Sequence, residues 1–223
     1  RDLLVNQTIE PTQLAGFNQF FDDFNGTSSN NYGIGLDARF TRTLFGGLEL
    51  MRRDLDMPFG GGPGPFSFEK FQMDLSRAYL YWLIDRNWSV TLEYLYQGST
   101  MREGQFLRMV YPTQLDTSAV PLNIRYFDPF GFFAGAGATY VHQRVDYDQE
   151  VNPLTPGSSN FVLLDATVGY RLPKRWGILA LEGRNLTDQH FQYQDYSFLT
   201  ASNSLNPPFL PERTVLGRFI LNF

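Results

Sequence analysis

The sequence predicts an all-β fold, an antiparallel up-and-down transmembrane β-barrel with about ten strands in this chain. Tight turns of three or four residues fall near residues 42, 86, 129 and 174. Loops of roughly a dozen to twenty residues separate them, and short turns on one side with long loops on the other are typical of membrane barrels. Aromatic residues near the expected strand ends, such as Trp88 and Trp176, fit the girdles that such barrels carry at the membrane interfaces.

Composition limits the alternatives to this fold. The chain has 223 residues, of which 21 are Phe and 12 are Tyr, and we treat residues 1–223 as one barrel domain. No stretch approaches the roughly 18 apolar residues of a membrane helix, whereas a barrel strand needs only about ten residues. The absence of cysteine excludes disulfides and thiolate sites. The net charge of −5 argues against nucleic acid as a partner.

The first half of the chain contains four expected strands. Apolar and polar side chains alternate in them, as Ile34 and Ala38 do against Asp37, because successive residues of a strand point to opposite faces. Residues 11–30 are expected to form a long loop. The prolines and glycines of residues 56–65 predict another loop, since proline lacks a backbone donor and glycine lacks a side chain that packs. The expected strands are residues 3–10, 31–40, 44–55 and 74–84.

Six further strands are expected in the second half. Leu92 and Tyr94 alternate with Glu93 in the strand that begins at Trp88. Asp128-Pro-Phe-Gly131 has aspartate first, proline second and glycine fourth, which is the residue order that a tight turn prefers. The expected strands are residues 88–96, 119–127, 132–147, 161–172, 176–193 and 213–223.

One segment near the end of the chain carries a family resemblance. Leu181-Glu-Gly-Arg-Asn-Leu-Thr-Asp-Gln-His-Phe191 resembles the penultimate strand of TonB-dependent outer-membrane receptors, whose recurring form is Asn-Leu-Phe-Asp followed by an aromatic residue. Asn185, Leu186 and Asp188 match that form, and Thr187 departs from it. Pro211-Glu-Arg213 is similar to the Pro-Gly-Arg element that precedes the terminal strand of the family.

The resemblance implies a setting and partners. It implies the outer membrane of a Gram-negative bacterium, with outer-membrane lipid around the barrel. In such barrels the terminal aromatic strand resembles the signal read by the outer-membrane assembly machinery, here Phe219, Leu221 and Phe223. Family receptors have about 22 strands, so we expect this chain to be the C-terminal part of a larger barrel. Two further segments, Gly16-Phe-Asn-Gln-Phe-Phe-Asp-Asp23 and Tyr126-Phe-Asp-Pro-Phe-Gly-Phe-Phe-Ala-Gly135, resemble a subgroup with tetratricopeptide repeats in place of a plug. This resemblance implies a periplasmic partner or other membrane subunits.

Charged residues at alternating positions are the candidates for a lumen-facing set. The residues are either an ion-pair network that fills a narrow lumen or a charged lining that selects solutes, and the sequence leaves both readings open. The set is Asp37, Arg39, Glu93, Arg125, His142, Arg144, Asp165, Arg171, Glu182, Arg184 and Arg218.

A second candidate site is a group of aromatic residues in the expected loop 11–30. Their spacing fits a helical turn as well as an irregular loop, and they are expected either to pack on the barrel wall or to contact a ligand at the extracellular mouth. The residues are Phe17, Phe20, Phe21 and Phe24.

Neither catalysis nor a cofactor is expected. His142 lies near Asp146 and His190 near Asp188, but no serine nucleophile and no metal-ligand spacing accompanies them. The Asp-rich segments lack the spacing of a calcium-binding loop, so we expect no resident metal. Together with the resemblance, this favours a porin-like or receptor-like barrel that passes a solute or polymer across the outer membrane. The alternative is a surface-exposed structural or partner-binding barrel without transport.

Overall fold

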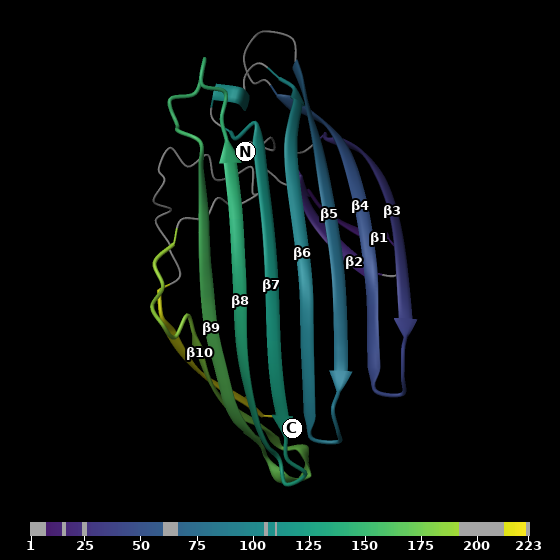
Figure 1. Ribbon diagram of the computed structural model, residues 1–223, viewed down its shortest axis with the longest axis vertical. Helices are drawn as coiled ribbons and strands as arrows, with labels where there is room; N and C mark the ends of the chain where they lie inside the picture. The colour runs from purple at the N-terminus through teal and green to yellow at the C-terminus, as the bar shows by residue number, and fades with distance from the viewer. Residues whose placement is uncertain are drawn as a thin grey trace.

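The computed structural model describes residues 8–14, 17–23, 26–59, 67–104, 107–109, 111–191 and 212–221. It is an all-β structure dominated by one nine-stranded antiparallel sheet (Figure 1). A separate hairpin and two short 3₁₀ turns, η2 (Leu107–Met109) and η3 (Pro173–Arg175), accompany the sheet. The strands are β1 (Thr8–Leu14) and β2 (Phe17–Asp23) in the hairpin, and β3 (Ser28–Arg39), β4 (Leu44–Phe59), β5 (Ser67–Leu83), β6 (Trp88–Glu103), β7 (Gln114–Phe127), β8 (Phe132–Asp146), β9 (Gly157–Arg171), β10 (Gly177–Arg184) and β11 (Thr214–Leu221) in the sheet.

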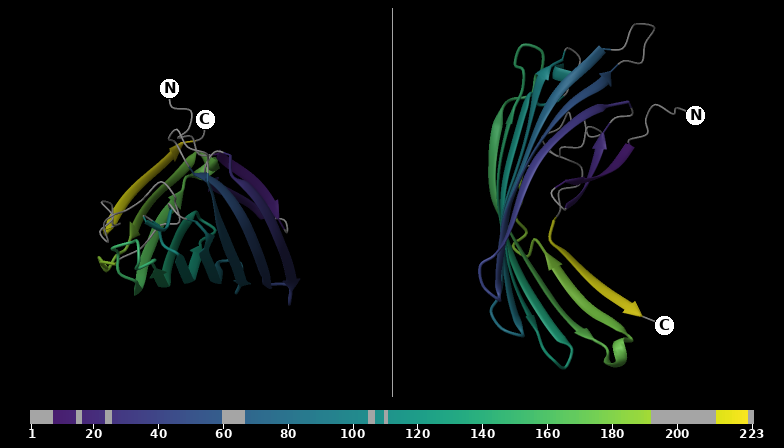
Figure 2. Two further views of the ribbon diagram at one scale, coloured as in Figure 1. Left: turned by 90° about the horizontal axis from the view of Figure 1, so that it is seen from above. Right: turned by 90° about the vertical axis from the view of Figure 1, so that its right-hand side faces the viewer.

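The sheet is a meander in which every strand pairs with its neighbours in the sequence. The order runs from β11 through β10, β9 and onward to β3, and all pairs are antiparallel. Within the described residues, β3 and β11 each pair with one strand only, so the sheet is not closed. Seen from above it forms an arch, and the β1–β2 hairpin lies on the concave side of that arch (Figure 2).

The central strands are longer than the alternation predicted. β4 has 16 residues and β5 has 17, or roughly 55 Å of extended chain at about 3.3 Å per residue. The prediction that residues 56–65 form a loop is wrong for 56–59, which continue β4 as far as Phe59. β3 pairs with β4 only as far as Asp56, so Pro58 lies where β4 has β5 as its one neighbour, a position that tolerates the missing donor.

A proline interrupts one strand ladder, and two further predicted boundaries differ from the structure. Pro121 lies inside β7, and the β6–β7 ladder is interrupted between the pairs Leu92–Leu122 and Leu95–Ala119, where the missing N–H would have been needed. The expected loop 11–30 is also wrong in part, because it contains β1, β2 and the start of β3. β10 ends at Arg184 rather than near residue 193.

The four short turns lie where the sequence predicts them, and side chains accept backbone N–H groups in three of them, through Thr41, Asp85 and Asp128. Asp85 Oδ1 accepts the backbone N–H of Asn87 at 2.7 Å and of Trp88 at 2.8 Å. Asp128 Oδ2 accepts the N–H of Phe130 at 2.8 Å, and Gly131 adopts a φ of 108°, which favours glycine. These carboxylates satisfy backbone donors that a tight turn leaves without partners.

The two faces of the sheet differ in burial. In β4, Met51, Leu55 and Met57 are at most 4% exposed, whereas Leu48 and Leu50 on the opposite face are 46% and 42% exposed. The buried side chains mark the concave face, where the hairpin lies and where inward side chains crowd one another. The pairing register carries this assignment across the sheet, so the concave face consists of odd-numbered residues in β3 to β9 and of even-numbered residues in β10 and β11.

The buried apolar core occupies one end of the concave face. It lies at the end remote from the short turns, near the end of β4 and the start of β5 and near the end of β6 and the start of β7. The other end of the concave face, nearer the short turns, carries polar side chains and glycines together with aromatic rings such as Phe127 and Phe133. The core consists of Leu55, Met57, Phe71, Met73, Met101 and Leu107.

Candidate functional site on the concave face

Most of the charged residues predicted to share one face do so. Nine of them lie on the concave face by the pairing register, namely Asp37, Arg39, Glu93, Arg125, Asp165, Arg171, Glu182, Arg184 and Arg218. His142 and Arg144 differ, because they lie on the convex face: Gly135 and Gly137 occupy the concave positions of β8, and an even-numbered residue of that strand therefore points the other way.

Over β3 to β6 the concave face is filled by a hydrogen-bonded network. Arg77 Nε donates to Glu93 Oε2 at 3.0 Å, and Arg77 Nη2 donates to the Tyr81 hydroxyl at 2.6 Å. The Tyr81 hydroxyl in turn donates to Glu93 Oε1 at 2.9 Å. The Tyr79 hydroxyl donates to Asp37, and the Tyr79 ring centroid lies 5.0 Å from the Arg77 guanidinium. Arg77 and Glu93 thus pair across neighbouring strands, and Asp37 of β3 is reached by Tyr79 of β5 across β4.

The sequence reading missed three members of this network, Arg77, Tyr79 and Tyr81. A usable signal was present, because in the predicted strand 74–84 these residues alternate with Ala78, Leu80 and Trp82. When the period of two is applied to this strand and to the strand that begins at Trp88, Arg77, Tyr79 and Tyr81 fall on the polar face, as Glu93 does.

A second ion-pair group lies over β10 and β11. Arg218 Nη2 is 2.9 Å from Glu182 Oε1, and Arg184 Nη2 is 3.5 Å from Glu182 Oε2. The Glu182 side chain is 14% exposed, so two guanidinium groups offset the cost of holding this carboxylate out of water.

Between these two groups the concave face is hollowed over β7 to β9. We call this cavity of about 290 Å³ the β8 hollow. Its floor is β8, where Gly135 pairs with Arg125 of β7 and with Thr167 of β9. The next row pairs Gly137 with Asn123 and with Asp165. Because the two glycines have no side chains, they leave the floor of the hollow open.

The walls of the β8 hollow carry both polar and aromatic groups. Phe127 and Phe133 line its end nearest the short turns. The Arg171 guanidinium lies 5.4 Å from the Phe127 ring centroid, which holds that cation beside the hollow. Asp165 Oδ1 accepts the backbone N–H of Asn185 at 2.9 Å, so this carboxylate is held in place while its second oxygen remains an acceptor.

The convex face divides into two zones. We call the first the apolar band: every second residue of 32–38, 44–50, 78–82, 88–94, 120–126, 132–140, 162–170, 179–181 and 215–221. Each of these residues is aliphatic, aromatic or glycine, and within these described ranges none of them is charged. Many are well exposed, including Leu36 at 69%, Leu92 at 41% and Phe219 at 59%. The band adjoins the short turns.

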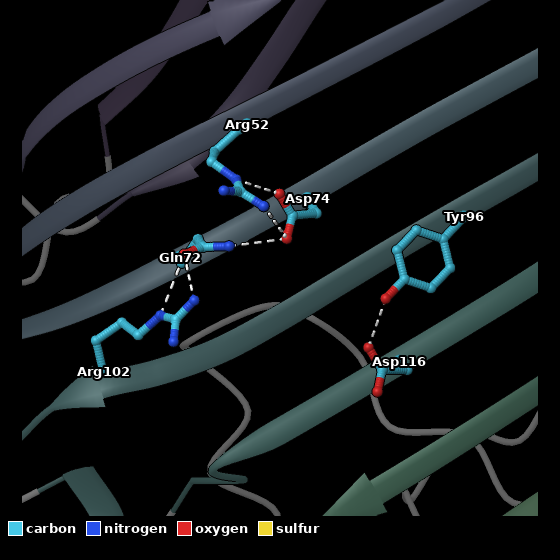
Figure 3. A network of polar contacts seen from close by, with 6 residues as sticks. All are labelled: Arg52, Gln72, Asp74, Tyr96, Arg102 and Asp116. Atoms are coloured by element: carbon cyan, nitrogen blue, oxygen red, sulfur yellow. Dashed lines mark hydrogen bonds and ion pairs between the residues drawn. The ribbon is translucent and has the colours of Figure 1, made fainter.

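The second zone, which we call the polar zone, is the mostly polar remainder of the convex face on β4 to β9. Figure 3 shows six of its residues. Arg52 Nε donates to Asp74 Oδ1 at 2.7 Å, and Gln72 donates to Asp74 Oδ2 at 2.9 Å. Arg102 Nη2 donates to Gln72 Oε1 at 2.6 Å. His142 and Arg144 belong to this zone, so these two polar side chains lie on the convex face of the sheet and not on the concave face.

Tyr96 and Asp74, which both lie in the polar zone, have shifted pKa values. Burial and a 2.8 Å hydrogen bond to Asp116 raise the pKa of Tyr96 to about 12. Burial opposes ionisation of Asp74, but the hydrogen bonds from Arg52 and Gln72 outweigh it and hold the pKa of Asp74 below its ordinary value.

The motif at Asn185 has a local structural role. Asn185 is 4% exposed with a φ of 48°, and its side chain bonds the Gln189 backbone through Nδ2–O at 3.0 Å and Oδ1–N at 2.9 Å. The Arg213 backbone N–H donates to Asp188 Oδ1 at 2.9 Å, immediately before β11 begins. We call these contacts the β10–β11 clamp. Asparagine and aspartate suit it because they tolerate a left-handed backbone and bond the main chain.

The other predicted residues lie outside this site. Phe17, Phe20 and Phe21 belong to strand β2, so both conformations considered for them, a helical turn and an irregular loop, are wrong, and Phe24 lies outside the described residues. Phe219 and Leu221 lie on the convex face of β11, and Phe223 also lies outside the described residues.

The described part of the chain defines a class by its architecture, an open antiparallel meander with an apolar convex band and a polar concave wall. Comparison of the chain with protein-family models, curated proteins and solved structures finds no match. Within the described residues no helix is long and apolar enough to cross a membrane. The same residues contain no cluster of three or more His, Cys, Asp or Glu side chains placed to hold a metal ion.

Proposed function

We propose that this chain forms a wall of an outer-membrane β-barrel through which a solute crosses the outer membrane. The observation that carries the proposal is the apolar band. A continuous apolar belt over nine neighbouring strands is costly in water and is what a lipid-facing surface requires. The opposite face of the same strands is polar, as expected of a wall that lines an aqueous interior.

The dimensions of the band support this setting. In β6 to β9 it spans runs of seven to nine residues, or roughly 23–30 Å of strand at about 3.3 Å per residue. With the strand tilt of about 40° usual in barrels, this becomes roughly 18–23 Å, comparable with the lipid-facing band about 25 Å tall. The polar zone then extends beyond the hydrocarbon layer on the side opposite the short turns, which agrees with short turns in the periplasm.

The open edges of the sheet support a larger assembly. β3 and β11 expose backbone groups that lipid cannot satisfy, and a spanning sheet must pair both of its edges. We propose that further strands complete the barrel. The motif at Asn185 and the aromatic convex face of β11 support the resemblance to TonB-dependent receptors, which implies recognition by the outer-membrane assembly machinery.

The proposal is tested by ion conductance of the protein in planar bilayers. Reversing the concave charges with Arg39→Glu, Arg125→Glu and Arg218→Glu should raise the permeability of cations relative to anions, because charged side chains set pore selectivity. Arg102→Glu, on the convex polar zone, is the matched control and should leave selectivity unchanged. Unaltered selectivity in the three concave variants would contradict the proposal, as would the absence of any conductance from correctly inserted protein.

One observation favours the alternative, a structural or partner-binding barrel without transport. The core around Leu55, Met57 and Leu107 fills the concave face at its end remote from the short turns. If that core closes the interior, the inserted protein should not conduct. Conductance that appears when Met57 and Leu107 are both replaced by Ala, and only then, would favour this alternative.

A further inference from the structure

The β8 hollow differs from the two neighbouring ion-pair groups of the concave face, because its arginine, Arg125, has no carboxylate partner among the described residues. In the neighbouring groups Arg77 bonds Glu93 and Arg218 pairs with Glu182. The Arg125 side chain makes no hydrogen bond or ion pair with any other described residue. If the wall lies within the thickness of the membrane, as proposed, an arginine on it without a carboxylate partner offers five N–H donors to a molecule that enters the interior of the barrel.

The groups opposite Arg125 are of another kind. Across the floor formed by Gly135 lies the Thr167 hydroxyl, and across Gly137 the Asn123 amide faces the Asp165 carboxylate. Hydroxyl and amide groups donate and accept, and the carboxylate accepts. The pairing register thus places one cationic donor at one corner of the hollow and three groups suited to hydroxyls around it.

The shape of the β8 hollow limits the ligand to a small molecule. Its volume of about 290 Å³ leaves room for one small solute with some water. The rings of Phe127 and Phe133 close the end nearest the short turns and offer an apolar face. A polymer or a large chelate would have to bind elsewhere.

We propose that the β8 hollow binds a small organic anion that also carries hydroxyl groups, with Arg125 on the carboxylate or phosphate of the ligand. Asn123, Thr167 and Asp165 bond its hydroxyls, and the two phenylalanine rings contact its carbon skeleton. The proposal rests on the proposed function only in so far as solutes must reach the concave face. The inference names the class of solute that binds at one site on the concave face.

The experiment is isothermal titration of the purified full chain in detergent micelles with D-glucuronate and with D-glucose. Both sugars have the same ring, but only D-glucuronate carries a carboxylate. D-glucuronate should bind, and D-glucose should bind at least about ten-fold more weakly, because a charge-assisted hydrogen bond to arginine is lost. Arg125→Gln should remove this preference, while Arg102→Gln on the convex face should retain it.

A second variant tests the space of the hollow and keeps its charge. A Cβ at Gly135 would lie 3.6 Å from the Ile124 carbonyl oxygen and 3.7 Å from Arg125 Cγ, which are ordinary contacts. Gly135→Leu should therefore fold and fill the hollow, and it should abolish D-glucuronate binding. Far-ultraviolet circular dichroism of each variant checks that it folds.

Three outcomes would overturn the inference: no binding of D-glucuronate, equal binding of the two sugars, or undiminished binding by Arg125→Gln. The outcome is independent of the conductance test. Binding without conductance would refute solute passage and leave the site standing, and conductance without binding would refute the site alone.

Discussion

The two faces of β6 show how one strand serves two environments. Leu92 on the convex face is 41% exposed and belongs to a band without charges. Glu93, the next residue, lies on the concave face within hydrogen-bond distance of Arg77 and Tyr81. The contrast teaches that exposure alone does not define the surface of this protein, because within the apolar band the exposed face is the apolar one and polar groups such as Glu93 lie on the opposite, concave face.

The largest expected effect comes from placing a charge in the apolar band. Leu92→Arg should destabilise the protein folded in lipid vesicles by about 2–4 kcal/mol, the cost of a cation facing the middle of the bilayer. Urea titration of the vesicle-inserted protein measures this difference. Thr91→Arg changes the adjacent residue on the concave face and should cost much less. Equal losses for the two variants would show that the convex face is not the lipid-facing one.

The next effect comes from breaking the concave network. Glu93→Ala should cost about 1–3 kcal/mol, because Arg77 and Tyr81 lose their acceptor in a partly buried site. The double variant Arg77→Met with Glu93→Leu should recover part of that loss, since no uncompensated charge remains. Urea titrations of the single and double variants give the coupling energy. Strict additivity would mean that the network contributes nothing beyond its separate members.

A smaller effect is expected in the polar zone from Tyr96→Phe, which removes one hydrogen bond to Asp116 and should cost about 0.5–1.5 kcal/mol. The raised pKa of Tyr96, about 12, favours the neutral phenol in the folded state. This stabilisation is therefore complete below the ordinary tyrosine pKa of about 10 and is lost as the pH rises toward 12. Absorbance at 295 nm in wild type and variant isolates this titration. A Tyr96 that ionises near pH 10 would contradict the contact.

The smallest effect is expected from Asp74→Asn. Its ion pair with Arg52 is exposed, so the loss near neutral pH should be only about 0.2–1 kcal/mol. Because the pKa of Asp74 is lowered, its contribution is present above the unfolded value near 3.8 and disappears as the pH falls through the lower folded value. Stability of wild type and variant should therefore converge in acid. A difference that grows on acidification would have the wrong sign.

Alternation and turn chemistry predict a large part of this fold. The period of two locates the main-sheet strands, and residues such as Asp128 locate the short turns, because both depend on neighbours in the sequence. Strand ends are less predictable. Pro58 continues a strand since its missing donor falls beside an edge, and that fact depends on where β3 stops pairing.

The candidate site was predictable only in part, for a related reason. His142 and Arg144 are polar, and polarity alone assigned them to the inner face. Beyond the apolar band, at the end remote from the short turns, the convex face is polar as well. Polarity therefore identifies the inner face only within the band. The β8 hollow depends on the register that sets Gly135 between Arg125 and Thr167, which three separate strand sequences do not reveal.

The β10–β11 clamp has a practical consequence for protein engineering. Asn185 and Asp188 hold the chain where it leaves β10, and the Arg213 N–H fixes it where β11 begins. Both attachment points lie on the same short stretch of backbone, so these contacts help to fix the register of the terminal strand against β10. An epitope or affinity tag inserted between residues 191 and 212 should therefore leave β11 paired with β10, which offers a place to label the protein without disturbing its terminal strand.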